Sequence, residues 1–221
     1  MGATSGSVAK AADGEMQTGA EAAPVARPRD ILDIHLDSHF ADRQGRGAVT
    51  QMDAVELRLD DPELDSDLKA ALEYWQRKRG SRLAPARADI DPVDLASLLP
   101  RVMLVDVSTE PLDFRFRLVG TGIFKIHGAE LTNKRARDLE PPAFAALMHR
   151  LYCDALTRRS PIAHRLLIEA EIRRSAYMRI ILPLSEDGVA INRLMTVESY
   201  ADCAQDLRDC FEEARLSANC S

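Results

Sequence analysis

Three histidines in this chain are candidates for binding a cofactor. His127, His149 and His164 lie in its most strongly patterned half, and an imidazole is a common axial ligand of haem iron. Each also fits a structural role. His149 and His164 fall inside periodic apolar segments, so we expect hydrogen-bonded or solvent-facing side chains. His127 directly precedes a glycine, so we expect a turn residue. The sequence therefore disfavours haem.

The four cysteines offer little further chemistry. They form no Cys-x-x-Cys pair, so a structural zinc site is not expected. Cys153 falls within a predicted helix, and a buried inert thiol is the commoner state at such a position. We therefore predict reduced thiols and no covalent flavin adduct. Any cofactor is left unidentified. The cysteines are Cys153, Cys203, Cys210 and Cys220.

Two further motifs resemble parts of known ligand-binding or catalytic sites. Gly120-Thr121-Gly122 resembles part of a phosphate loop, but the remaining glycine and the Lys-Ser/Thr pair of a P-loop are missing. We expect a tight turn leaving a strand. Glu169 and Glu171 have the spacing of one strand face, yet neither has an obvious partner for acid–base work. These patterns predict that the chain is not an enzyme.

Composition restricts the class of protein further. The chain has 221 residues, a net charge of −6 and 46% hydrophobic residues, which suits one sizeable core. Nucleic-acid-binding domains are usually strongly basic, so we do not expect this acidic chain to bind nucleic acid. No apolar run reaches the roughly 20 residues that span a bilayer, and no signal peptide is visible. We expect a cytoplasmic protein.

The elements that must position these residues follow from hydrophobic periodicity. The sequence predicts a disordered or weakly ordered tail over residues 1–47. It predicts a folded domain over residues 48–201 and an amphipathic helix or tail over residues 202–221. The domain opens with a possible strand near residues 49–59 and a helix over 61–79, with Asp61 as its cap and Gly80 as its end. A second long helix is predicted over 141–160. Five strands are predicted over 102–108, 113–120, 161–170, 175–185 and 189–200.

The order is two strands, a helical insert and three strands in a meander. In the second strand Phe114, Phe116 and Leu118 alternate with Arg115 and Arg117, which indicates one core face and one solvated face. A single antiparallel sheet with the insert on one face satisfies this order. The predicted fold class is therefore α+β, a five-stranded antiparallel sheet with an added N-terminal flanking helix.

At this point the chain resembles the PAS superfamily, and more narrowly a bacterial group of single-PAS-domain proteins. The resemblance spans about residues 64–201. It rests on Tyr74-Trp75, on Arg87-Ala88-Asp89-Ile90-Asp91-Pro92, and on the run from Phe114 to Thr121. A Gly-x-x-Leu-Thr step follows at Gly128–Thr132, with Asn133 where a glycine is more usual.

The resemblance implies a sensory or regulatory module with a pocket between the sheet and the insert, which could hold a small apolar or amphipathic ligand. Because about twenty residues follow the last strand, we expect output through contacts with signalling proteins such as kinases or regulators. A homodimer, an enzyme using the same cavity and a purely structural module stay open as alternatives. The expected pocket lining is Phe116, Leu118, Phe124, Leu147, Leu151, Met178, Ile180, Leu194 and Thr196.

Two apolar stripes could serve as interfaces. One is on the helix predicted over residues 61–79, and the other is on the C-terminal helix. Packing on the protein's own body is the alternative for both. The residues concerned are Leu64, Leu68, Leu72, Trp75, Leu207 and Phe211.

Overall fold

The computed structural model describes residues 2, 51–200 and 203–219. The tail predicted over residues 1–47 lies outside these residues, apart from Gly2. The described chain forms an antiparallel sheet of six strands in the order β1-β4-β5-β6-β2-β3. The fold class is therefore α+β, as predicted. The strands are β1 (Gln51–Leu57), β2 (Val102–Thr109), β3 (Leu112–Val119), β4 (Ile162–Glu169), β5 (Arg174–Leu184) and β6 (Arg193–Ser199).

The sixth strand is β1, and it corrects the predicted strand number. It pairs with β4 from Gln51 opposite Glu169 to Leu57 opposite Ala163. A strand near these residues was predicted, but its place in the sheet was not. The pairing joins segments more than one hundred residues apart, which local periodicity cannot reveal.

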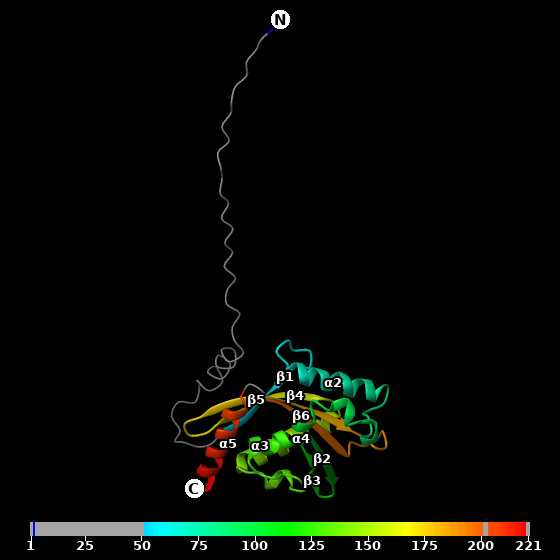
Figure 1. Ribbon diagram of the computed structural model, residues 1–221. Coiled ribbons are helices and arrows are strands. Elements are labelled where there is room, and N and C mark those ends of the chain that lie inside the picture. The colour runs from blue at the N-terminus through cyan, green and yellow to red at the C-terminus, as the bar shows by residue number, and fades with distance from the viewer. Residues whose placement is uncertain (1, 3–50, 201–202, 220–221) are drawn as a thin grey trace.

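Helices cover both faces of the sheet (Figure 1). α2 (Ser66–Arg79) lies on one side, and α3 (Thr121–His127), α4 (Pro142–Arg158) and α5 (Ala204–Asn219) lie on the other. Short 3₁₀ turns occur at 87–89, 93–95, 99–101 and 136–138. The central strands are therefore buried on both faces, which explains their apolar character at both odd and even positions.

The cap of α2 lies four residues later than predicted. The Asp65 side chain accepts a hydrogen bond from the Asp67 amide and caps the helix. Asp61 instead accepts from the Glu63 amide in a turn before the helix. The helix ends at Gly80 as predicted, and this residue has φ +58°, a conformation that favours glycine. The Trp75 indole N–H donates to the Pro183 carbonyl of β5 at 2.7 Å, which fixes α2 on the sheet.

A bulge interrupts the alternation of β3. Phe116 is opposite Val105 and Leu118 is opposite Leu104, so Arg117 is an extra residue with no partner in the register. One extra residue moves every later side chain to the other face. Phe116 is consequently buried while Leu118 is 41% exposed. The predicted common face for these two side chains is wrong for this reason.

Candidate functional site

Two charged side chains lie on the face of the sheet that α4 covers. Arg179 of β5 and Glu198 of β6 are direct partners in the antiparallel register, so their side chains leave the sheet on the same side. The Arg179 guanidinium contacts the Met148 sulfur of α4, which identifies that side. The side chains are 1% and 0% exposed. A charged pair therefore sits inside the molecule.

Hydrogen bonds hold this pair in one geometry. Arg179 Nε donates to Glu198 Oε1 at 3.1 Å, and Nη2 donates to the same oxygen. Nη2 also donates to the Tyr177 hydroxyl at 3.2 Å. The guanidinium carbon lies 6.0 Å from the centre of the Phe144 ring, within cation–π range. Buried charges are tolerated when they are paired and hydrogen-bonded in this way.

Four buried polar atoms near the pair have no hydrogen-bond partner within the described part of the chain. They are Glu198 Oε2, Thr196 Oγ1, Tyr152 OH and Tyr200 OH. Nearly all buried polar atoms in native proteins have a partner. These four therefore mark a place where a small polar group or ordered water would be satisfied. We call Tyr152, Tyr177, Arg179, Thr196, Glu198 and Tyr200 the interior polar cluster.

Burial sets the protonation of this cluster. Desolvation raises the pKa of Glu198, against the opposing charge and hydrogen bond of Arg179. Desolvation also raises the pKa of Tyr152 to about 12 and that of Tyr177 well above its usual value. The tyrosines are therefore neutral hydroxyls at physiological pH, and each can donate or accept a hydrogen bond. The cluster offers donors and one free carboxylate oxygen to a ligand.

A protein-family model described as PAS domain matches residues 65–197, which is more than half of the chain. The chain belongs to the PAS domain family. The predicted PAS resemblance is thereby confirmed at the level of the superfamily, and a sensory or regulatory role in signalling is the general function of such domains. A search of curated proteins found no match.

Within this PAS domain, only some predicted pocket residues lie on the side of the sheet that α4 covers. Phe116 packs against Tyr152 with ring centroids 6.5 Å apart, and Thr196 belongs to the interior polar cluster. Leu194 precedes Thr196 by two positions and so shares its face of β6. Leu147 and Leu151 are buried residues of α4.

The remaining predicted pocket residues lie elsewhere. Met178 and Ile180 alternate with Arg179, so they face α2 on the opposite side of the sheet. Leu118 is turned outward by the bulge in β3. Phe124 is 48% exposed, because the short α3 buries Ile123 and Ile126 and leaves the intervening ring outside. These four assignments are corrected.

The predicted interface residues are core residues. The two stripes on α2 and α5, together with Leu64 before α2, are at most 6% exposed and pack within the chain itself. Both stripes therefore pack on the protein's own body, which was the alternative to an interface. The residues are Leu64, Leu68, Leu72, Trp75, Leu207 and Phe211.

The Gly-Thr-Gly motif makes a packed corner. A Cβ on Gly120 would lie 2.3 Å from the Pro100 carbonyl oxygen, and one on Gly122 would lie 2.6 Å from the Tyr200 hydroxyl. The Gly120 amide donates to the Val102 carbonyl at 2.8 Å. The glycines are thus required by close packing, and the Gly120 amide is already bound within the chain.

Two of the three histidines, His127 and His164, are more deeply buried than expected. His127 lies between Phe144 and Phe211, with ring centroids 5.2 and 4.2 Å away. It ends α3 and is 4% exposed, so the prediction of a turn residue is wrong. His164 is also 4% exposed and its Nδ1 has no hydrogen-bond partner among the described residues. Desolvation lowers the pKa of both, to about 3 and about 4.

The described ranges contain neither a metal-binding cluster nor a membrane-spanning helix. No group of three or more metal-ligating side chains occurs within residues 51–200 and 203–219. In the same ranges, no helix is long and apolar enough to cross a bilayer. Cys153 Sγ does lie 3.6 Å from His149 Nδ1, as a nucleophile–base pair would. Burial raises the pKa of this thiol, however, which disfavours the reactive thiolate.

The sequence analysis missed Arg179 and Glu198, although a signal was present. Both lie within almost entirely buried strands that carry apolar residues at both odd and even positions. A strand of that kind is central and buried, so a charged residue inside it requires a partner of opposite charge. Glu198 is the one carboxylate in the neighbouring strand β6.

Proposed function

We propose that this PAS domain senses a small ligand at the interior polar cluster and acts in bacterial signal transduction by contacting a partner protein. The partner would be a kinase or a regulator, and the site of action would be the cytoplasm. The family assignment supports a sensory role in general. The single observation that carries the ligand proposal is the set of four unsatisfied polar atoms beside the buried ion pair.

The chemistry of the cluster favours an amphipathic ligand. Its polar end would accept hydrogen bonds from the Tyr152, Thr196 or Tyr200 hydroxyls, or donate one to Glu198 Oε2. Its apolar part would lie against side chains such as Phe116 and Leu151, which are 1% exposed. Entry requires α3 or α4 to move from the sheet, because these side chains are closely packed in the present arrangement.

The proposal treats the chain as non-catalytic. The interior cluster contains a cation, a carboxylate and hydroxyls, but the carboxylate is already engaged by Arg179 through one oxygen. A general base needs access to a substrate proton, and the complete burial of Glu198 denies it that access in the present arrangement. The raised pKa of the Cys153 thiol also argues against nucleophilic catalysis at α4.

Native mass spectrometry of the freshly purified full chain tests the ligand. We expect a mass above that of the bare chain, which denaturation returns to the bare value. In Arg179→Met/Glu198→Met the excess mass should disappear while circular dichroism stays native. The matched control Asp106→Asn/Arg193→Gln removes a partly exposed ion pair between β2 and β6 and should retain the excess mass. An excess mass that survives in the interior variant would contradict the proposed site.

The signalling role is tested in the source organism. Deleting the gene should change the phosphorylation of at least one kinase or response regulator, and a chromosomal copy of the interior variant should reproduce the change at equal protein abundance. Unchanged phosphorylation after deletion would refute the signalling role.

A further inference from the structure

An exposed cluster of cations lies along β3, the last strand in the sheet order. The outer edge of β3 is partly occupied by residues 133–135. The Phe116 amide donates to the Lys134 carbonyl at 3.0 Å, and the Asn133 amide donates to the Phe116 carbonyl at 2.7 Å. This pairing brings the cations of two segments together. We call Arg115, Arg117, Lys134, Arg135 and Arg137 the basic edge, and all five are exposed.

The arrangement places like charges opposite each other. Arg115 and Arg135 form an antiparallel bridge, so their side chains are direct cross-strand neighbours. Like charges in such a position destabilise a sheet. On its other side Arg115 is opposite Asp106 of β2, whose carboxylate already accepts a hydrogen bond from Arg193 at 2.7 Å.

The carboxylates nearby balance only part of this charge. Asp113 Oδ2 lies 2.8 Å from Arg135 Nη1 and 2.9 Å from Arg137 Nη2. Within the described ranges, Arg115, Arg117 and Lys134 have no carboxylate at ion-pairing distance. The basic edge therefore carries a surplus of positive charge on a chain whose net charge is −6.

The chemistry of the basic edge selects a short acidic partner. An arginine guanidinium binds a carboxylate through two parallel hydrogen bonds, and several arginines in a row suit successive carboxylates along a chain. A bilayer or a nucleic-acid duplex is an extended polyanion, and it would also meet the acidic residues that surround the edge, such as Glu130 and Asp138. A short Asp/Glu-rich segment covers less of the surface and can match its carboxylates to Arg115, Arg117 and Lys134.

We propose that the basic edge is the docking surface for an Asp/Glu-rich segment of the partner protein. This inference rests on the proposed function, since it names the chemistry by which that partner is recognised. Binding would neutralise the charge repulsion between Arg115 and Arg135. The chain's own fold would then be stabilised by its partner.

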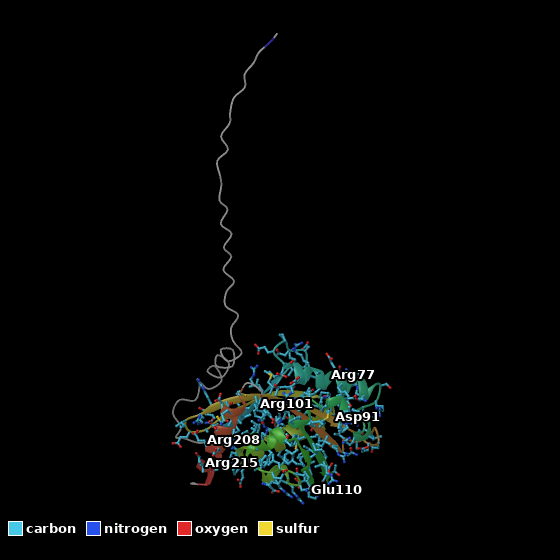
Figure 2. All side chains as sticks on the ribbon, viewed as in Figure 1. Arg77, Asp91, Arg101, Glu110, Arg208 and Arg215 are labelled. Atoms are coloured by element: carbon cyan, nitrogen blue, oxygen red, sulfur yellow. The ribbon has the colours of Figure 1, made fainter. Side chains whose placement is uncertain are left out.

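A fluorescent Glu-rich peptide is the probe, with binding to the full chain measured by fluorescence anisotropy. The test variant is Arg115→Gln/Arg117→Gln/Lys134→Gln, which leaves the two ion pairs of Asp113 intact. The matched control is Arg77→Gln/Arg79→Gln/Arg208→Gln. Figure 2 shows Arg77 on α2 and Arg208 on α5, away from the β2–β3 turn that carries Glu110.

We expect the test variant to bind the peptide at least about tenfold more weakly than the wild type and the control to bind it normally. Affinity should fall when sodium chloride is raised from about 50 to about 300 mM. Equal peptide binding by the wild type and the test variant, or no binding by either, would overturn the proposal.

Other occupants would be recognised by parallel measurements, and each would overturn the proposal. Tighter binding to vesicles containing phosphatidylglycerol, or to duplex DNA, would assign the edge to that polyanion. Self-association that the test variant abolishes would assign it to a second copy. The site on that copy would be the acidic surface groove of about 840 Å³ between the β4–β5 turn and α5, lined by Glu171, Ile172, Asp209, Glu212 and Leu216 among others.

The proposed function can fail independently. If deletion of the gene alters phosphorylation but the test variant behaves as wild type, the basic edge is refuted and the signalling role stands. If deletion alters nothing, the signalling role is refuted, whereas the peptide measurement still reports on the edge itself.

Discussion

The stability of this PAS domain should fall steeply in mild acid because His127 is buried in its neutral form. The imidazole lies between the rings of Phe144 and Phe211 and is 4% exposed. Desolvation, with the positive charges of Arg179 and Arg215, lowers its pKa from the usual 6.5 to about 3. Protonation therefore favours the unfolded chain.

The sign and size follow from the two pKa values. Above pH 6.5 neither state is protonated at His127, and the full stability is present. As the pH falls from 6.5 toward 3, the unfolded chain binds a proton that the folded chain does not, so stability is lost. At about pH 5 the loss from this residue is about 2 kcal/mol, since each pKa unit corresponds to 1.36 kcal/mol.

His164 should contribute a similar loss. It is 4% exposed, and desolvation lowers its pKa to about 4 despite the opposing charge of Glu56. Between about pH 6.5 and about pH 4, the unfolded chain binds a proton at His164 that the folded chain does not bind. The two histidines together should lower the free energy of unfolding by about 4 kcal/mol between about pH 8 and about pH 5.

The variant His127→Phe isolates the first contribution. A phenyl ring keeps the contacts with Phe144 and Phe211 but cannot bind a proton. Urea unfolding at about pH 8 and about pH 5 gives the pH-dependent loss for each protein, and the carboxylates that titrate in both proteins cancel in the comparison. We expect the loss in the variant to be smaller by about 2 kcal/mol. Equal losses in the two proteins would refute the assignment.

Three further substitutions test the fold by urea unfolding at neutral pH. Arg179→Met should cost about 3–5 kcal/mol because it leaves Glu198 buried without its partner, whereas the double variant with Glu198→Met should regain most of that loss. Gly122→Ala should cost about 1–3 kcal/mol because its Cβ would meet the Tyr200 hydroxyl 2.6 Å away. Trp75→Phe should cost about 1–3 kcal/mol through the loss of a buried 2.7 Å hydrogen bond to β5. The ion-pair assignment would be contradicted if Arg179→Met were as stable as the double variant. The contacts of Gly122 and Trp75 would be contradicted if Gly122→Ala or Trp75→Phe were as stable as the wild type.

Hydrophobic periodicity was sufficient to predict the order of the strands and long helices, because each one buries a regular stripe. α4 was expected over residues 141–160 and spans Pro142–Arg158. Periodicity could not predict which face of a central strand meets which helix. β5 is apolar on both faces, so Met178 and Ile180 were assigned to the insert although they face α2.

The errors in β3 and in the site have related causes. The bulge at Arg117 is a property of the pairing with β2, and the sequence of β3 alone reads as an unbroken alternation. The Arg179–Glu198 pair likewise depends on the register of β5 with β6. Both charges are visible in the sequence, but their pairing follows only from that register.

The buried pair and the basic edge are connected through β3. Apolar residues of similar volume often replace a buried ion pair at little cost. Phe116 physically joins the two places. Its ring contacts Tyr152 of the interior polar cluster, and its backbone pairs with Asn133 and Lys134 beside the basic edge. A ligand that displaced the Tyr152 ring would therefore disturb the strand pairing that holds Arg115 opposite Arg135. Any such coupling must be reciprocal, so an acidic segment bound at the edge would change the affinity for the ligand by the same factor.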